Sequence, residues 1–253
     1  MQVKEFTKDK LFIKVFETSD LMGRSAANFV AGILNKATSE KGSANLILAT
    51  GASQFSFLEH LQKEEIEWQK ITVFHLDEYN GMPETHPASF RKYLKERILD
   101  NVKPKEAHYI SGDSPDSAIE IKRYENLLLD HEIDVACIGI GENGHLAFND
   151  PPVADFNDKK LVKVVELDSN CRLQQLNEGW FKNIDDVPKE AITLTIPAIM
   201  RSRIISCVVP DERKSEAVYN TINMEISEKC PATILRAHPN ATLFLDKSSA
   251  VKL

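Results

Sequence analysis

The stretch of residues 134–152 carries the side chains best suited to chemistry, and it reads DVACIGIGENGHLAFNDPP. The continuous apolar run of residues 135–140 predicts a strand that is buried on both faces. Glycines follow, and then come Asn143, His145 and Asp150. In an open parallel sheet the carboxyl ends of the strands face the ligand crevice. A histidine there, flanked by an amide and a carboxylate, has the partners that acid–base catalysis needs. The alternative is a histidine whose hydrogen bonds are satisfied inside a tight turn.

The same stretch spells G-x-G-x-x-G, with Gly139, Gly141 and Gly144, as in a dinucleotide-binding site. Such a site needs a helix that opens at the last glycine and holds the pyrophosphate at its N-terminus. Pro151 and Pro152 stop any helix within two turns. The sequence therefore favours glycines that turn the backbone sharply and let a small ligand approach, and it predicts no nucleotide cofactor.

A second candidate site is the turn formed by Thr50, Gly51, Ala52 and Ser53, between a predicted strand and a predicted helix. Hydroxyl groups, a glycine and backbone amides at the start of a helix can bind a phosphate group. The turn is not a Walker motif, because no lysine follows at the required spacing. A plain helix cap at Ser53 is an equally good interpretation.

Two charged clusters follow other apolar runs. Asp77 and Glu78 come directly after residues 71–76, and charges that end a buried strand are costly unless they are solvated or used. The alternatives for this pair are a helix cap and a solvated strand end. Lys214 lies in the first turn of a helix predicted to begin near Asp211. A lysine there opposes the helix dipole, which makes it a candidate for binding an anion; the alternative is an ordinary surface lysine.

The elements that must position these side chains alternate along the chain. Helical spacing predicts helices that begin near residues 19, 54, 89, 119 and 211. Apolar runs predict strands at residues 11–16, 44–50, 71–76, 135–140, 161–167, 192–197, 203–210 and 241–246. This alternation predicts an α/β protein with an open, mostly parallel, doubly wound Rossmann-like sheet and helices on both faces. We expect one domain over residues 1–253, with a lid over the crevice at about residues 154–189, where the core pattern is weakest.

Composition narrows the class of function. The chain has 253 residues, of which 42% are hydrophobic and 27% charged, as in an ordinary soluble globular protein. Its net charge of −7 argues against nucleic-acid binding. No apolar run is long enough for a membrane span, and the N-terminus lacks a signal-peptide core. The four cysteines show no C-x-x-C spacing, so we expect neither a disulfide framework nor a zinc site, and we expect a reducing, cytoplasmic location.

The motifs ATGAS, HLDEYNGM, GIGENGHLAFNDP, DERKSEA and PATILRAHP occur in this order along the chain. With them the sequence resembles the glucosamine-6-phosphate deaminases, also called isomerases, over nearly its whole length. The resemblance implies a Rossmann-like α/β fold and the conversion of glucosamine 6-phosphate and water to fructose 6-phosphate and ammonia, without a metal or another cofactor. The related 6-phosphogluconolactonases share the fold but normally lack the tyrosine–glycine element at 79–81 and the A-F-N run at 147–149.

The resemblance also implies roles at the reacting end of the site. Asp77 matches the general base that moves a proton between carbons 2 and 1 of the sugar. His145 matches the residue that handles the ring-oxygen proton during ring opening. Asn143 matches the group that works beside this histidine, and Asp150 matches an acidic partner. We expect the Asn143 amide to accept the imidazole N–H and so orient the ring.

At the phosphate end the resemblance assigns the loop of residues 51–53 and Lys214. Arg172 is the nearest match to a phosphate-binding arginine of the lid. The chain departs from the commonest pattern in several places: residue 150 is Asp where Glu is usual, residue 143 is Asn rather than Asp, and the turn reads G-A-S-Q instead of a glycine-rich turn closed by a proline. These departures leave the exact amino sugar open.

Three functions are compatible with these observations: an amino-sugar-phosphate deaminase, a sugar-phosphate lactonase on the same fold, and a non-catalytic sensor of sugar phosphates. The deaminase is the interpretation that the motifs favour. The expected partner is a small sugar phosphate rather than a nucleic acid or a membrane. The sequence leaves the oligomeric state open, a homo-oligomer included.

Overall fold

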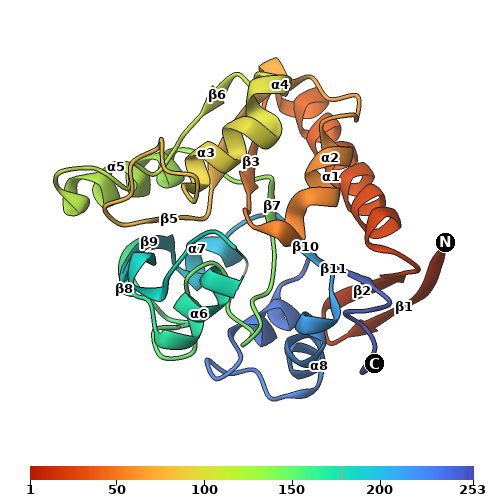
Figure 1. The fold of residues 1–253 in the computed structure, drawn as a ribbon. Helices are drawn as coiled ribbons and strands as arrows, with labels where there is room; N and C mark the ends of the chain where they lie inside the picture. The colour runs from red at the N-terminus through yellow and green to blue at the C-terminus, as the bar shows by residue number, and fades with distance from the viewer. Residues whose placement is uncertain (178) are drawn as a thin grey trace.

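The computed structural model describes residues 1–177 and 179–253, which build a central eight-stranded sheet in the order β1-β2-β11-β10-β7-β3-β4-β6 (Figure 1). Neighbouring strands are parallel, except that β1 and β2 form an antiparallel hairpin at one edge. The predicted open, mostly parallel sheet is confirmed. Its strands are β1 (Gln2–Lys8), β2 (Leu11–Phe16), β3 (Ala44–Leu48), β4 (Ile71–His75), β6 (Glu106–Ala107), β7 (Val135–Ile138), β10 (Ile204–Val209) and β11 (Ala241–Asp246).

Helices cover both faces of this sheet because successive side chains of a strand point to opposite sides. In β3, Leu46 and Leu48 pack into a core shared with α1, α2 and α3. Ile47 packs into a second core, shared with α5, α7 and α8. No helix in the described part of the chain is both long and apolar enough to cross a membrane. The helices are α1 (Ser19–Lys41), α2 (Phe55–Leu61), α3 (Phe90–Leu94), α4 (Asp100–Val102), α5 (Ser117–Asp130), α6 (Ser169–Asn177), α7 (Ile196–Met200) and α8 (Ser215–Asn223).

A second, three-stranded antiparallel sheet lies beside the first and groups with α6 and α7 in Figure 1. It consists of β5 (Asp77–Tyr79), β9 (Glu190–Leu194) and β8 (Val162–Glu166). The strands predicted at residues 161–167 and 192–197 therefore pair with each other, the second of them also pairs with β5, and neither extends the parallel sheet. The reason is that an apolar run specifies a buried strand but not its partner or its direction.

The expected lid segment contains more regular structure than its polar composition suggests. It holds β8, α6 and a short 3-10 turn at Ile184–Asp186. Val165, Cys171 and Phe181 from this segment are buried in a small core together with Tyr79 of β5. The segment is thus attached to the strand that carries Asp77.

Candidate active site

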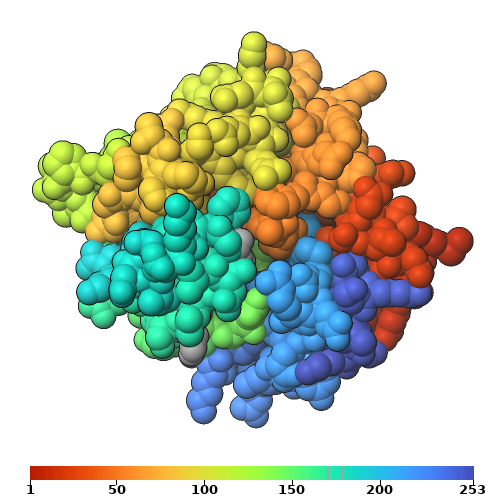
Figure 2. All heavy atoms as spheres, in the orientation of Figure 1, coloured from red at the N-terminus to blue at the C-terminus, as the bar shows by residue number. Residues whose placement is uncertain are grey.

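A cavity of about 470 Å³ opens at the carboxyl ends of β3, β4, β7, β10 and β11, as expected for an open parallel sheet. Figure 2 shows the surface hollowed where the orange segment near residue 50, the teal lid segment and the blue segment near residue 210 meet. Seven of the residues singled out from the sequence line it: Thr50, Gly51, Ala52, Ser53, Asp77, His145 and Lys214. The topology therefore brings together groups that are far apart in the sequence.

The loop after β7 holds His145 at the wall of this cavity. The loop reverses sharply at Ala147, which has a φ of 51°, and Asn149 stabilises the turn by donating to the backbone carbonyls of Leu146 (2.9 Å) and Leu194 (2.8 Å). The reversal returns Asp150 to the histidine, so that His145 Nδ1 lies 2.9 Å from Asp150 Oδ1. No helix opens after Gly144 in this loop, in agreement with the argument against a dinucleotide site.

Asp150 lies behind His145 and is almost fully buried. Burial raises the pKa of its carboxyl, but the neighbouring His145 and the hydrogen bonds from His145 and Asn143 outweigh burial, so the pKa is lower than its ordinary value. Asp150 is therefore a carboxylate at neutral pH. A carboxylate that accepts from Nδ1–H leaves the other imidazole nitrogen, Nε2, for proton exchange.

The structure corrects the position expected for Asn143. Its amide does not accept the imidazole N–H, because that contact belongs to Asp150. Asn143 Nδ2 instead donates to Asp150 Oδ1 over 2.7 Å, and its Oδ1 accepts the backbone N–H of His145 over 3.1 Å. Asn143 thus supports the carboxylate and the loop, and it does not line the cavity.

Residue 141 has to be a glycine because the His145 ring occupies the space that a side chain would need. A Cβ built on Gly141 would lie 2.2 Å from both Cε1 and Nε2 of His145. The imidazole ring therefore lies directly against the backbone, and any larger residue would displace it.

Asp77 and Glu78 have different roles in the structure: Asp77 lines the cavity, and Glu78 is a helix cap. Asp77 lines the cavity and is only 7% exposed. Burial raises the pKa of Asp77 to about 8, and the nearby Glu78 adds to that shift. Glu78 is fully buried and caps α3: it accepts from Ser89 Oγ (2.7 Å) and from the backbone N–H of Arg91 (3.1 Å). Only Asp77 is in a position to touch a ligand.

The turn after β3 is held in shape from two sides. Gly51 has a φ of 94°, which favours glycine, and its carbonyl accepts the hydroxyl of Tyr93 over 2.7 Å. Gln54 Nε2 donates to Ser53 Oγ (3.1 Å) and to the carbonyl of Val208 (3.3 Å). Because Ser53 Oγ accepts from Gln54, its own O–H can donate to a ligand in the cavity.

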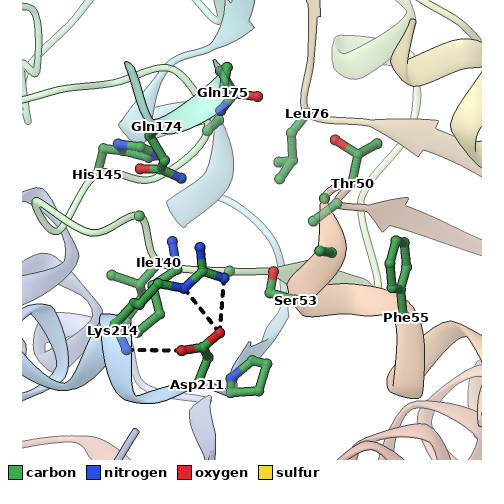
Figure 3. Close-up of a pocket in the computed structure, with 18 of the residues that line it drawn as sticks. Thr50, Ser53, Phe55, Leu76, Ile140, His145, Gln174, Gln175, Asp211 and Lys214 are labelled. Atoms are coloured by element: carbon green, nitrogen blue, oxygen red, sulfur yellow. Dashed lines mark hydrogen bonds and ion pairs between the residues drawn. The ribbon is translucent and has the colours of Figure 1, made fainter. Parts of the chain in front are cut away.

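Lys214 enters the cavity from the turn that joins β10 to α8. It is buried and lies in the short 3-10 helix Glu212–Lys214. Asp211, with a φ of 84°, shapes this turn and accepts from the guanidinium of Arg213 over 2.9 Å (Figure 3). A buried ammonium group on a cavity wall gains from an anionic ligand.

Arg172 does not reach the cavity. Its guanidinium donates to the backbone carbonyls of Val187 (3.0 Å) and Ile184, so it ties α6 to the end of the lid segment. Two neighbours on α6, Gln174 and Gln175, line the cavity instead. The sequence analysis did not single them out; adjacent amides in a segment expected to cover the crevice are the signal that could have found them.

Figure 3 shows how the labelled side chains are distributed around the cavity. His145, Gln174 and Gln175 lie on one side, and Thr50 and Ser53 lie on the other. Across the described residues, no three His, Cys, Asp or Glu side chains gather in a way that could hold a metal ion. The groups that the cavity does assemble are a carboxyl, an imidazole–carboxylate pair, hydroxyls, amides and an ammonium group.

Residues 17–244 match the family described as glucosamine-6-phosphate isomerases/6-phosphogluconolactonase. The chain belongs to this family. A glucosamine-6-phosphate deaminase of Exiguobacterium sp. is 39% identical over 203 residues, which cover 80% of this chain and 78% of that protein. A glucosamine-6-phosphate deaminase of Bacillus cytotoxicus is 34% identical over 237 residues, which cover 94% of this chain and 87% of that protein.

Solved structures agree with this family assignment. The chain superposes on a monomeric glucosamine-6-phosphate deaminase with a TM-score of 0.85 and 31% identity, covering 94% of this chain and 98% of that one. A 6-phosphogluconolactonase from Thermotoga maritima superposes with a TM-score of 0.77 and 20% identity, covering 94% of this chain and 100% of that one. The second likeness shows the shared fold alone.

Proposed function

We propose that the protein converts glucosamine 6-phosphate and water to fructose 6-phosphate and ammonia. The observation that carries this proposal is the meeting of Asp77 and the His145–Asp150 pair in one cavity that also contains the Thr50–Ser53 turn and Lys214. Isomerisation needs a base at a carbon-bound proton and a second group for the ring oxygen, and the cavity offers one of each. Relatives that are deaminases, at 34–39% identity, support the same reaction.

Ring opening is the step assigned to His145. With Nδ1 directed at the Asp150 carboxylate, His145 presents Nε2 to the sugar. There it carries a proton from the hydroxyl on carbon 1 to the ring oxygen as the bond between that oxygen and carbon 1 breaks. Asp150 holds the tautomer and stabilises the imidazolium that forms in between.

Proton transfer between carbons 2 and 1 is the step assigned to Asp77. The carboxylate takes the proton from carbon 2, and the ammonium group on carbon 2 gives one of its protons to the carbonyl oxygen on carbon 1, so that an enol with an amino group on carbon 2 forms. Return of the proton to carbon 1 leaves an iminium at carbon 2, which adds water and expels ammonia to give the ketone. The raised pKa keeps Asp77 protonated in the empty cavity at neutral pH, but the ammonium group on carbon 2 favours the ionised carboxylate once the substrate is bound.

The phosphate group is assigned to the opposite end of the cavity. Hydroxyl and backbone groups of Thr50–Ser53 provide donors, and Lys214 provides a positive charge. We assign the role of a lid to residues 154–189, which supply Gln174 and Gln175 to the cavity wall. Exclusion of water by such a lid strengthens each of these electrostatic contacts.

A reducing compartment suits this chain, and we assign the activity to the cytoplasm. All four cysteines are buried free thiols. Burial raises the pKa of Cys171 and of Cys230, so these thiols stay protonated and unreactive.

The proposal is tested by measuring ammonia release from a panel of hexosamine 6-phosphates, with 6-phosphogluconolactone hydrolysis assayed in parallel. We expect ammonia and a ketose phosphate from glucosamine 6-phosphate, at a rate well above that of any lactone hydrolysis. Lactone hydrolysis without ammonia would establish a lactonase. Thermal stabilisation by the sugar phosphates with neither product would establish a sensor.

A further inference from the structure

Helix α6 brings two carboxamide side chains, Gln174 and Gln175, to the cavity wall, where the roles assigned so far use neither of them. Both are labelled in Figure 3, on the same side of the cavity as His145. The cavity wall also carries charged, hydroxyl and apolar side chains, and neutral amides among them suit recognition of uncharged polar atoms of a ligand. Of the two, Gln175 has the better-defined position.

Gln175 is buried and held by one strong contact. Its Oε1 accepts the hydroxyl of Tyr79 over 2.7 Å. Tyr79 is itself fully buried. The centroid of its ring lies 5.0 Å from the ring centroid of Phe90 and 5.4 Å from that of Phe148. An anchor packed in this way fixes the orientation of the amide that it contacts.

This contact determines which atoms Gln175 offers to a ligand. Once Oε1 accepts from Tyr79, the remaining polar group is the Nε2 amide with its two N–H donors. Within residues 1–177 and 179–253, this nitrogen has no hydrogen-bond partner in the protein. This nitrogen is not among the fully buried unpaired polar atoms of these residues, and Gln175 lines the cavity, so its N–H groups are available to an acceptor oxygen of a ligand there.

The anchor also locates Gln175 along the substrate. Tyr79 and Asp77 are two residues apart in β5, so their side chains leave the strand on the same side. Gln175 therefore belongs to the part of the cavity near Asp77, away from the Thr50–Ser53 turn. Between carbons 1 and 2, where Asp77 acts, and the phosphate on carbon 6, the sugar presents its hydroxyls on carbons 3 and 4.

We infer that Gln175 is a specificity residue: its Nε2 donates to the hydroxyl oxygen on carbon 3 or 4 and so selects the configuration of the amino sugar. This inference rests on the proposed function and names the substrate feature that the same site recognises. Tyr79 is a positioning residue, because its hydroxyl holds the Gln175 amide. A site built to hydrogen-bond a hydroxyl discriminates strongly against an epimer that places it elsewhere.

The test replaces Gln175 by Met, which has a similar shape but no N–H. kcat/KM is measured for glucosamine 6-phosphate and for its epimers at carbons 3 and 4. We expect Gln175→Met to lower kcat/KM for the preferred epimer by about 10- to 100-fold and to reduce the preference over at least one epimer by about tenfold. An unchanged preference in a folded variant would overturn the inference.

Two further variants separate recognition from structure. Tyr79→Phe removes the anchoring hydroxyl but keeps the Gln175 donors, so its loss of epimer preference should be smaller than that of Gln175→Met. Equal effects of the two variants would show that Gln175 only ties α6 to β5. Leu173→Ala, at an exposed position on the same helix, should match the wild-type protein in rate and preference.

Binding of hexitol 6-phosphates, measured by calorimetry, distinguishes failure of the inference from failure of the proposed function. These open-chain compounds keep the hydroxyls on carbons 3 and 4 but cannot be isomerised. Gln175→Met should weaken the preferred hexitol 6-phosphate about tenfold or more, even if no hexosamine 6-phosphate releases ammonia. Absence of ammonia with this binding loss would overturn the proposed function alone, and unchanged binding would overturn the inference.

Discussion

Asp77 and Asp150 are two buried carboxyl groups beside one cavity, and their surroundings move their pKa values in opposite directions. Asp150 is paired with His145 and accepts a second hydrogen bond from Asn143, which lowers its pKa in spite of burial. Asp77 is buried beside another acidic residue, Glu78, and its pKa rises to about 8. The same side chain is therefore ionised at neutral pH in one place and protonated in the other.

The comparison shows how one residue type can serve two chemical roles. A carboxylate that never takes up a proton can hold an imidazole in one tautomer throughout a reaction. A carboxyl whose pKa lies near neutrality can both accept and return a proton. Environments that separate two carboxyl pKa values in this way are typical of acid–base catalysts.

The largest expected effect comes from Asp77→Asn, which keeps the shape of the side chain but removes its basicity. Loss of one positioned base typically lowers kcat by about 100- to 10,000-fold. Deuterium incorporation from solvent into the sugar should stop together with ammonia release. Both are measured by NMR and a coupled ammonia assay.

The control for this variant is Lys214→Ala, which should raise KM and change kcat much less. Removal of a charge-assisted phosphate contact typically raises KM about 10- to 100-fold. Turnover of Asp77→Asn near the wild-type rate would show that another group is the base.

Asp150→Asn should have the next largest effect. The amide oxygen can still accept from His145 Nδ1, but the charge that stabilises the imidazolium is lost. We expect kcat to fall about 100-fold and the acidic limb of the pH–rate profile to move to lower pH. A profile that keeps its position would mean that Asp150 orients the ring without acting through its charge.

Asn143→Asp should change activity by less than about tenfold. It places a second carboxyl where an amide now lies 2.7 Å from Asp150 Oδ1, and two carboxylates at that distance share one proton. The pair carries one negative charge and still accepts from His145, and loss of the shared proton at higher pH adds a second negative charge beside the imidazole. The alkaline limb of the pH–rate profile measures this change. A folded but inactive variant would show that the amide itself is required.

The smallest expected effect is on stability and depends on pH. The Asp77 carboxyl has an unfolded pKa near 3.8 and a folded pKa of about 8, so the folded protein binds the extra proton between these values. Its contribution to stability is fully present below pH 4 and is lost as the pH rises through 8. Asp77→Asn removes this loss, so its melting temperature should exceed that of the wild-type protein by a few degrees at pH 9 and by less at pH 5. Equal differences at the two pH values would contradict the raised pKa.

Much of the fold follows from local sequence pattern. The runs around Leu46 and Val135 are apolar on both faces, which only a strand covered by helices on both sides can satisfy. β1 could not be predicted in this way, because its side chains are mostly exposed and show no apolar alternation. The small antiparallel sheet could not be predicted from local pattern either, because β8 and β9 are about 30 residues apart in the sequence and an apolar run does not specify its partner strand.

In the candidate site, too, some residues could be predicted from local sequence pattern and others depend on tertiary packing. Asp77, His145 and Lys214 follow apolar runs, and the sheet topology then brings them to one edge. The contact between His145 and Asp150 depends on the left-handed backbone of Ala147, which no residue type announces. Arg172 and Gln175 lie on one short helix, and which of them faces the cavity depends on how α6 packs against Tyr79 and Val187.

The chain passes from the parallel sheet to the small sheet through a single residue, Leu76, whose carbonyl accepts the backbone N–H of Leu194 over 2.8 Å. Amide hydrogens of β5 that bond to β9 can exchange with solvent only when the small sheet opens, and α6 stays attached to β5 through the contact between Gln175 and Tyr79. The strand that carries Asp77 is therefore held by both sheets, and we expect its carboxyl to keep its position from one turnover to the next.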